Sequence, residues 1–450
     1  MGTFAREIYD VVGIGFGPSN LSLAIALDEY RTEGAGSSRS GPSAMFFERQ
    51  SSFGWHRNML LPTTTMQISF MKDLATFRNP VSPFGFVSYL HASGRLTQFV
   101  NNQDFFPTRQ EFHQYLEWAA AGFTDRVRYG TEVTGIRLPA ATEVGAAEPY
   151  VELEVRSGST TRVVGARNVA ISTGLVPRMP KGVQRDERVW HSSEFLDRYS
   201  RRNPSELNTV AVVGAGQSAA EITRYLYDEL PHAQVYSIIP SYGYCVADDT
   251  PFANQIFDPG AVDTYFFGTD RSREAFWHYH RNTNYSVVDD EVIRDLYRRA
   301  YDEEVRGLDR LRFLNLSRVD QVKRAGDETR VSLLSLPTDE TRELDVDAIV
   351  FATGYDAMEP TALLGDLDRH CLRDESGRYR VARDYRLITA PELSCGIYLQ
   401  GGTEHTHGLT SSLLSNLAVR SGEIAESIIG RRAEPAAEPL LRPVVAGETG

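Results

Sequence analysis

Residues 8–21 read IYDVVGIGFGPSNL, and residues 209–221 read TVAVVGAGQSAAE. Each stretch begins with an apolar run typical of a buried strand, passes through a glycine-rich turn and leads into an apolar helical pattern. This order predicts a strand, a tight turn and a helix at both places. Neither turn is a strict GxGxxG, because Pro18 and Ala219 stand where the third glycine would be. The occurrence of two copies, more than either copy alone, decides the fold.

A turn of this kind places the N-terminus of a helix against a pyrophosphate group. Its glycines permit the sharp bend and let the backbone approach the phosphates closely. Two copies predict an α/β enzyme with two Rossmann-like dinucleotide-binding domains. The first turn is predicted to comprise Gly13, Gly15, Gly17, Pro18 and Asn20, and the second Gly214, Gly216, Gln217, Ser218 and Glu221.

The strand after each turn indicates which dinucleotide binds there. Glu48 ends the apolar run 44–47, where an acid accepts the ribose 2′-hydroxyl and repels a 2′-phosphate. The first site therefore suits FAD. The strand after the second turn is followed by Ser241 and Tyr242 instead of an acid, which favours NADPH. No arginine stands beside them in sequence, so the group that would hold the 2′-phosphate is not identified.

Two further apolar runs, at 168–174 and 347–356, end in Thr-Gly. One precedes the second nucleotide motif and the other follows it, which indicates a nucleotide domain inserted into a flavin domain. We expect residues 1–204 and 346–430 to form the FAD domain, and residues 205–345 the NADPH domain. A helical substrate-binding region is expected at about 245–310, and exposed or disordered segments at 32–43, 139–149 and 431–450.

Composition excludes several other classes of protein. The net charge of −13 over 450 residues argues against a nucleic-acid binder, which needs a basic surface. Three widely spaced cysteines exclude a disulfide framework, a thiolate metal site and a redox pair, and they fit a reducing cytoplasm. We expect no resident metal, no signal peptide and no membrane span, since no apolar run approaches 18 residues.

Longer blocks of sequence carry a specific resemblance. They include 53–80, 105–120, 248–259, 280–293, 351–356 and GGTEHTHGLTSSLLS at 401–415. Together with the two glycine turns, they resemble the N-hydroxylating flavin monooxygenases of siderophore and piperazate biosynthesis, the ornithine and lysine N-monooxygenases. The resemblance extends over 8–430 and is strongest to the bacterial ornithine N-hydroxylases.

The resemblance implies a reaction carried by cofactors. NADPH reduces FAD, reduced flavin takes up O2 to give a C4a-hydroperoxyflavin, and the side-chain amine of L-ornithine attacks its distal oxygen to give N5-hydroxy-L-ornithine. No protein acid or base is expected to be catalytic. The amine must be neutral to react, and a lysine-like amine has an ordinary pKa of about 10.4, so deprotonation at pH 7 costs roughly 4–5 kcal/mol. A dry pocket would lower that cost.

The resemblance also implies site residues. Lys72 matches the lysine that meets the substrate carboxylate, Asn254 and Asn284 match the asparagines at the α-carboxylate and α-amine, and Ser412 matches a serine near the reacting amine. Each also has a purely structural explanation, such as a surface lysine or a helix cap. Further positions match the flavin site at Trp55, His56, Met66, Gln67, Arg109 and Leu409, and the NADPH site at Thr353 and Gly354. Arg109 fits a flavin-side arginine or a salt bridge at a helix start equally well.

Alternatives remain within this class. A lysine N6-hydroxylase differs by one methylene of substrate, which is worth only about 1–3 kcal/mol in a pocket. A diamine hydroxylase would have no use for Lys72, and residues 180–191 lack the spacing of a Baeyer–Villiger fingerprint. An uncoupled NADPH oxidase and a non-catalytic flavin-binding module are also open. A homo-oligomer, tetramer or dimer, is implied only by the resemblance, and strict preference for NADPH over NADH is in doubt.

Overall fold

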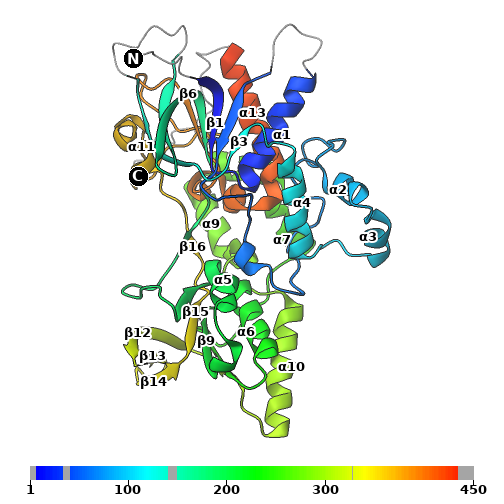
Figure 1. Ribbon diagram of the computed structural model, residues 1–450, viewed down its shortest axis with the longest axis vertical. Coiled ribbons are helices and arrows are strands. Elements are labelled where there is room, and N and C mark those ends of the chain that lie inside the picture. Colours follow the sequence, from blue (N-terminus) through cyan, green and yellow to red (C-terminus); the bar gives the residue numbers. More distant parts are fainter. Residues whose placement is uncertain (1–6, 34–40, 140–148, 327, 434–450) are drawn as a thin grey trace.

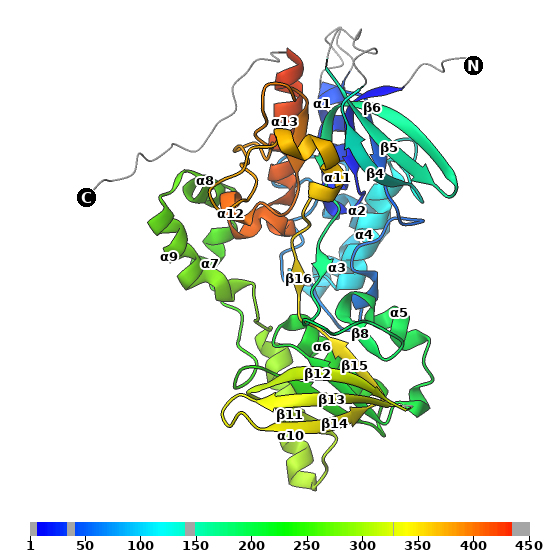
Figure 2. The same cartoon turned by 90° about the vertical axis from the view of Figure 1, so that its left-hand side faces the viewer.

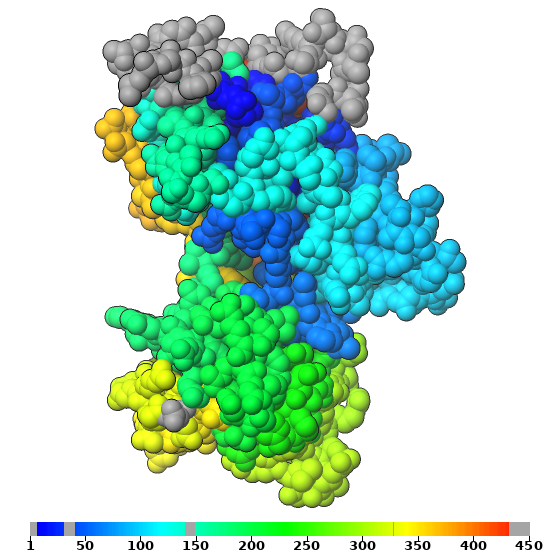
Figure 3. All heavy atoms as spheres, viewed as in Figure 1, coloured from blue at the N-terminus to red at the C-terminus, as the bar shows by residue number. Residues whose placement is uncertain are grey.

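The computed structural model describes residues 7–33, 41–139, 149–326 and 328–433. It has two lobes joined by a narrow waist (Figures 1 and 3). Each lobe is built on its own mainly parallel sheet, and each sheet contains the strand of one of the two glycine motifs. The two predicted dinucleotide folds are therefore both present.

The first lobe contains a seven-stranded sheet in the order β3-β2-β1-β6-β5-β4, with β17 paired to β6. Five of these strands pair with one another in parallel: β1, β2, β3, β6 and β17. The other two are antiparallel, because β5 pairs antiparallel with β6 and β4 pairs antiparallel with β5. Helices α1 (Pro18–Glu33) and α13 (Leu417–Ala433) pack against each other over the sheet (Figure 1). The strands are β1 (Ile8–Ile14), β2 (Ala44–Phe47), β3 (Val127–Arg128), β4 (Glu132–Arg137), β5 (Val151–Ser157), β6 (Thr160–Ile171) and β17 (Gly396–Leu399).

The second lobe contains a five-stranded parallel sheet in the order β11-β10-β9-β15-β8. A separate antiparallel sheet, β12-β13-β14, lies beside it. The strands are β8 (Val189–His191), β9 (Thr209–Val213), β10 (Gln234–Ile238), β11 (Leu311–Leu314), β12 (Ser317–Ala325), β13 (Glu328–Ser335), β14 (Thr341–Val346) and β15 (Ala348–Phe351). The expected boundaries need correction, because β8 and β15 lie outside 205–345 and yet complete this sheet.

Two paired strands, one loop and the chain on either side of residues 251–280 connect the lobes. The chain enters the second lobe through β7 (Val176–Pro177) and leaves it through β16 (Tyr355–Asp356), and these two strands pair antiparallel in the waist (Figure 2). Residues 57–67, which we call the arm, extend from the first lobe. Met59 and Leu61 of the arm are buried within the hydrophobic core of the second lobe. The lobes are therefore joined by packing as well as by the chain.

The predicted helical region divides between the lobes. Helix α8 contacts α12 of the first lobe, whereas α10 packs on α6 and contributes Val292 and Leu296 to the core of the second lobe. The separate region therefore ends before α10, not near residue 310. The helices are α1 (Pro18–Glu33), α2 (Phe86–Ala92), α3 (Leu96–Asn102), α4 (Arg109–Ala121), α5 (Phe195–Ser200), α6 (Gln217–Glu229), α7 (Pro251–Asn254), α8 (Pro259–Phe267), α9 (Asp270–His280), α10 (Asp290–Arg306), α11 (Thr361–Leu364), α12 (Glu404–His407) and α13 (Leu417–Ala433).

The segments expected to be irregular lie mostly outside the described residues. Helix α1 runs to Glu33 and α13 to Ala433, so the segments expected from 32 and from 431 begin inside helices. The remainder, 34–40, 140–148 and 434–450, is not among the described residues. Within the described part of the chain, no helix is long and apolar enough to cross a membrane.

Candidate active site

The first glycine turn is shaped by close contact with the neighbouring strand. Gly15 has φ +82°, and a Cβ there would lie 2.5 Å from the carbonyl oxygen of Ser172, just after β6. A side chain at this position is therefore excluded by both backbone conformation and space. A Cβ at Gly17 would have no protein atom within 4 Å. Gly17 thus leaves open space immediately before the N-terminus of α1 at Pro18, where a pyrophosphate would lie.

Polar groups gather at the carboxyl ends of the parallel strands in the first lobe. Glu48 follows β2, and its two carboxylate oxygens accept the backbone N–H groups of Phe16 and Gln50, each at 2.8 Å. These bonds orient the carboxylate beside the glycine turn and leave further lone pairs for ribose hydroxyls. Among the described residues, the buried Ser172 Oγ and Gln400 Oε1 have no hydrogen-bond partner. The donor set fits a polar dinucleotide such as FAD.

Asn20, predicted as part of the first turn, bonds to the backbone of that turn. Its side chain is fully buried, and its Nδ2 donates to the carbonyl oxygen of Gly15 at 2.7 Å. Its Oδ1 accepts a hydrogen bond from Gln400 Nε2 at 2.8 Å. The amide therefore stabilises the turn from behind instead of pointing an unused group at a ligand.

The second glycine turn repeats the design of the first. Gly214 has φ +150°, and a Cβ there would lie 2.4 Å from the carbonyl oxygen of Ala352, just after β15. A Cβ at Gly216 would meet no protein atom closer than 3.8 Å, so open space again precedes a helix N-terminus. In both lobes the Thr-Gly strand lies parallel beside the glycine strand. The glycine turn and the Thr-Gly strand thus form one structural unit, which occurs once in each lobe.

The waist brings the second Thr-Gly to the predicted flavin neighbours. Thr353 Oγ1 donates to the carbonyl oxygen of Arg178 at 2.5 Å. The His191 Nε2 lies 3.0 Å from the carbonyl oxygen of Gly354, and because its Nδ1 accepts the N–H of Ser193, Nε2 is the donor. Burial lowers the pKa of His191. These bonds hold Thr353 by its hydroxyl group and Gly354 by its carbonyl oxygen.

His56 and Trp55 line the same region from the first lobe. Their ring centroids are 4.9 Å apart, and the His56 ring lies 6.4 Å from that of Tyr355, next to Gly354. The side chain of His56 is exposed, although protein atoms surround the ring. Loss of hydration, with the positive charge of Arg109 and the proximity of His113, lowers its pKa to about 4. The imidazole is therefore neutral at physiological pH.

Arg109 was expected either beside the flavin or in a salt bridge at a helix start, and it forms a salt bridge. Its guanidinium binds both carboxylate oxygens of Glu221 at 2.9 Å, and it also donates to the carbonyl oxygen of Met59. Glu221 was predicted to bind NADPH, but its side chain is only 2% exposed and is committed to Arg109 and Gln217. Gln67, predicted beside the flavin, donates to Asp289 at 2.9 Å. These residues connect the two lobes to each other.

The four predicted substrate residues come from distant parts of the chain, and the segments that carry them lie near one another. The Lys72 Nζ lies 5.7 Å from the ring centroid of Phe257, three residues after Asn254. Burial lowers the pKa of Lys72, partly offset by the charge of Asp258. Asn254 Nδ2 donates to the carbonyl oxygen of Asp249 at 2.7 Å, which fixes its amide. The turn 255–257 in turn packs on residues 409–412, which include Ser412.

The Glu404 carboxylate joins Ser412 to Tyr285, the chain neighbour of Asn284. Tyr285, next to Asn284, donates a hydrogen bond from its hydroxyl to Glu404 Oε1. Ser412 Oγ donates to the same oxygen at 3.4 Å. Burial and this bond to Glu404 raise the pKa of the Tyr285 hydroxyl. The segments that carry Lys72, Asn254, Asn284 and Ser412 are therefore neighbours, joined by contacts of Phe257, Tyr285 and Glu404.

Four residues predicted to bind FAD or NADPH have side chains that are buried and apolar, bonded to the backbone, or exposed. Met66 and Leu409 are buried at 6% and 1% exposure, and Met66 belongs to the hydrophobic core of the first lobe. Ser241 donates to the carbonyl oxygen of Gly243, and Tyr242 is 83% exposed after β10. The roles predicted for Ser218 and for these four residues in binding remain predictions.

Comparison with known proteins identifies the family. Residues 7–357 match the family described as L-lysine 6-monooxygenase/L-ornithine 5-monooxygenase. The L-ornithine N(5)-monooxygenase of Burkholderia cepacia is 38% identical over 438 residues, which cover 95% of this chain and 96% of that protein. The chain belongs to this family.

Solved structures of the family have the same fold. The ornithine N-hydroxylase of Kutzneria sp. 744, described with reduced FAD, NADP+ and L-ornithine, is 60% identical with a TM-score of 0.89, covering 94% of this chain and 100% of that chain. The L-lysine 6-monooxygenase of Pseudomonas syringae is 29% identical with a TM-score of 0.79, covering 94% of this chain and 99% of that chain. The similarity is thus greater to the ornithine enzyme.

Sequence reasoning missed the residues that connect the family positions. Tyr285 and Glu404 lie inside the quoted blocks 280–293 and 401–415, yet their chemistry gave no reason to select them. Asp289 and Gln400 were missed for the same reason. Their roles depend on contacts across more than 70 residues of sequence, which no local pattern reports.

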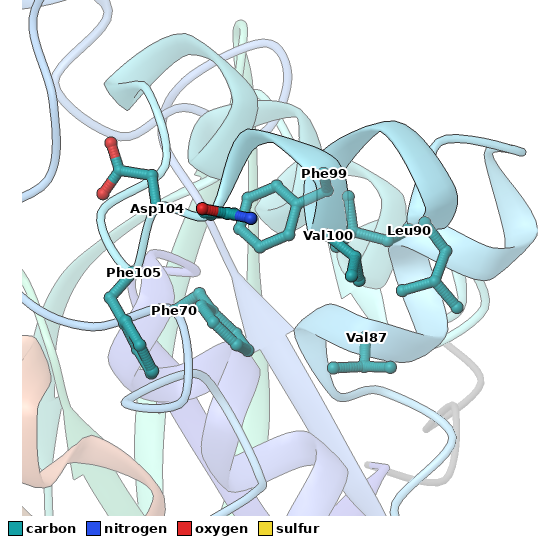
Figure 4. Close-up of a pocket in the computed structure, with 9 residues that line it drawn as sticks. Phe70, Val87, Leu90, Phe99, Val100, Asp104 and Phe105 are labelled. Carbon is teal, nitrogen blue, oxygen red and sulfur yellow. The ribbon is translucent and has the colours of Figure 1, made fainter.

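A separate apolar cavity of about 290 Å³ lies between α2 and α3 (Figure 4). Its lining is Phe70, Val87, Leu90, Leu96, Phe99, Val100, Gln103, Asp104 and Phe105. None of the predicted substrate or cofactor residues lines it, and only Asp104 brings a charge. We therefore do not place the substrate there.

Proposed function

We propose that this protein is an FAD- and NADPH-dependent L-ornithine N5-monooxygenase. The observation that supports the proposal most is that the four segments carrying Lys72, Asn254, Asn284 and Ser412 are neighbours, joined by contacts of Phe257, Tyr285 and Glu404. Membership of the family and the 60% identity to an ornithine N-hydroxylase support the choice of substrate.

The site has the groups that an α-amino acid with a side-chain amine requires. The ammonium of Lys72 would bind the substrate carboxylate, and its half-buried position strengthens such a bond by reducing competition from water. Amide groups at Asn254 and Asn284 can bind the carboxylate or α-amine without adding charge. FAD, when bound, would supply the oxygen-activating chemistry, so the residues need only orient the amine and exclude water.

The two dinucleotide sites fit the two cofactors. Gly15, Gly17 and Glu48 would hold FAD in the first lobe, and Gly214, Gly216 and Gln217 would hold NADPH in the second. Glu48 at the first site disfavours a 2′-phosphate, whereas Ser241 and Tyr242 at the second do not. Comparison of kcat/KM for NADPH and NADH tests this assignment, and a higher value for NADPH is expected.

L-lysine is the second candidate substrate, because the family includes L-lysine 6-monooxygenases. The experiment that separates the two is a measurement of hydroxylated product with each amino acid, at saturating NADPH and oxygen. We expect N5-hydroxyornithine to form at least tenfold faster than hydroxylysine. Consumption of NADPH alone is insufficient evidence, because release of hydrogen peroxide also consumes it.

We further propose a homo-oligomer in the cytoplasm. Three apolar side chains near α2 and α3 are exposed and suit a contact with another copy of the chain. They are Val87, Val100 and Phe105, at 46%, 62% and 61% exposure. The free thiols of Cys245, Cys371 and Cys395 suit a reducing compartment. Light scattering of the purified protein measures the oligomeric state directly.

A further inference from the structure

A polar network crosses between the lobes at the second glycine turn. Gln217, the first residue of α6, follows Gly216 directly. Its Nε2 donates to Asp289 Oδ2 at 2.8 Å, and its Oε1 accepts the backbone N–H of Asp289 at 2.9 Å. The other oxygen of Asp289 accepts Gln67 Nε2 at 2.9 Å, from the end of the arm. Asp289 therefore joins the first lobe to the residue that adjoins the nucleotide turn.

A buried ion pair reinforces the same connection. Gln217 Nε2 also lies 3.0 Å from Glu221 Oε1, and Glu221 binds Arg109 of the first lobe at two points. The side chains of Arg109 and Glu221 are 12% and 2% exposed. A bidentate pair in such surroundings has a defined geometry, because both groups lose their hydration and must find each other. The first turn of α6 is thus held from two sides.

Helix capping does not explain the placement of the Asp289 side chain. It is the N-cap residue of α10, yet its side chain makes no capping hydrogen bond. Asp290 and Glu291 already supply negative charge in the first turn of that helix. Loss of the Asp289 side chain would therefore remove its link from Gln217 to Gln67 without removing a helix cap.

We propose that Asp289 is a positioning residue that holds the second glycine turn against the first lobe and so sets the distance between nicotinamide and flavin. The inference rests on the proposed use of both cofactors. Hydride transfer from NADPH to FAD, which leaves NADP+ and reduced flavin, depends steeply on the separation of donor and acceptor. A misplacement of about 1 Å can cost up to 100-fold in rate.

The test uses three variants of the full-length enzyme loaded with FAD. Asp289→Ala removes both side-chain bonds. Asp289→Asn keeps one acceptor for Gln217, and its amide can donate to Gln67 after the Gln67 amide turns over. Asp290→Ala removes the same charge one residue away, from an exposed acid that pairs with Arg294. It is the matched control for the electrostatics of α10.

The first measurement is the rate at which saturating NADPH reduces the flavin in the absence of oxygen. The reduction is monitored by the absorbance of the flavin, and no amine is present. We expect the rate for Asp289→Ala to fall at least tenfold, and the rates for Asp289→Asn and Asp290→Ala to stay within twofold of wild type. Because no amine is present, a wrong choice of ornithine would not affect this result. A wild-type rate for Asp289→Ala, or an equal loss in Asp289→Asn, would overturn the proposal.

The second measurement does not require cofactors. Amide hydrogen exchange of the apoprotein is compared over the arm, 57–67, and over the second turn with the start of α6, 214–221. We expect faster exchange in both segments for Asp289→Ala alone. Exchange unchanged from wild type in both segments would contradict the proposed connection.

Discussion

The Nζ of Lys72 lies 5.7 Å from the centre of the Phe257 ring, across the boundary between the first lobe and the helical segment 251–267. A half-buried ammonium over an aromatic face is stabilised without being neutralised by a direct carboxylate partner. It keeps its charge available for a ligand. This relationship links the predicted carboxylate site to the turn that carries Asn254.

The first prediction concerns substrate binding. Replacement of Lys72 by Ala should raise KM for ornithine by about 10- to 100-fold, the equivalent of one charged hydrogen bond at about 1.5–3 kcal/mol. The rate of flavin reduction by NADPH should change little. Steady-state kinetics scored by hydroxylated product measures the first, and stopped-flow absorbance the second. Lys181→Ala, at an exposed lysine, is the control. Equal effects of the two variants would exclude Lys72 from the substrate site.

The second prediction concerns pH. The rate of hydroxylation at saturating ornithine should rise with pH, because only the neutral amine reacts. Burial lowers the pKa of Lys72 below its usual 10.5, so its charge should be lost at a lower pH than for an exposed lysine. KM for ornithine should therefore increase as pH rises through that lowered pKa. Product formation measured from pH 7 to 10 tests both trends, and a pH-independent hydroxylation rate would contradict the first.

The third prediction separates the two cofactor turns. Gly17→Ala and Gly216→Ala add a methyl group where no protein atom lies closer than about 3.8 Å, so the apoprotein should unfold at an unchanged urea concentration. The first variant should lose FAD, and the second should keep FAD but bind NADPH more weakly. Flavin content and the concentration dependence of flavin reduction measure these effects.

Gly15→Ala is the contrasting control for that pair. Its backbone at φ +82° and the Ser172 carbonyl 2.5 Å away should make this variant less stable even without cofactor. Equal stability of Gly15→Ala and Gly17→Ala would mean that the first turn differs from the one described.

The fourth prediction concerns Glu48. Its carboxylate holds the backbone of Phe16 and Gln50 and is predicted to bind the FAD ribose. Glu48→Gln keeps one acceptor oxygen and should weaken FAD binding about tenfold, the equivalent of roughly 1.4 kcal/mol. Titration of the apoprotein with FAD gives the dissociation constant. Glu154→Gln, on an exposed position of β5, should leave it unchanged, and an unchanged value for Glu48→Gln would exclude the ribose contact.

The sequence predicted the two sheets and their glycine turns because strand, turn and helix patterns are local. It misplaced the domain boundaries because β8 joins its sheet by parallel pairing with β15, which is distant in sequence. For the same reason α10 was assigned to the substrate region, although Val292 and Leu296 bury it against the second lobe. The family resemblance selected Arg109 and Glu221 individually. That they bind each other could not be predicted, since the contact spans 112 residues.

The most direct test of the central claim is a substrate panel with L-ornithine, L-lysine, putrescine and cadaverine. Hydroxylated product and hydrogen peroxide are each measured per NADPH oxidised. The proposed function predicts nearly one N5-hydroxyornithine per NADPH, much less hydroxylysine, and mainly hydrogen peroxide with the two diamines, which lack the carboxylate for Lys72. Efficient hydroxylation of a diamine, or hydrogen peroxide without hydroxylated product for every amine, would contradict it.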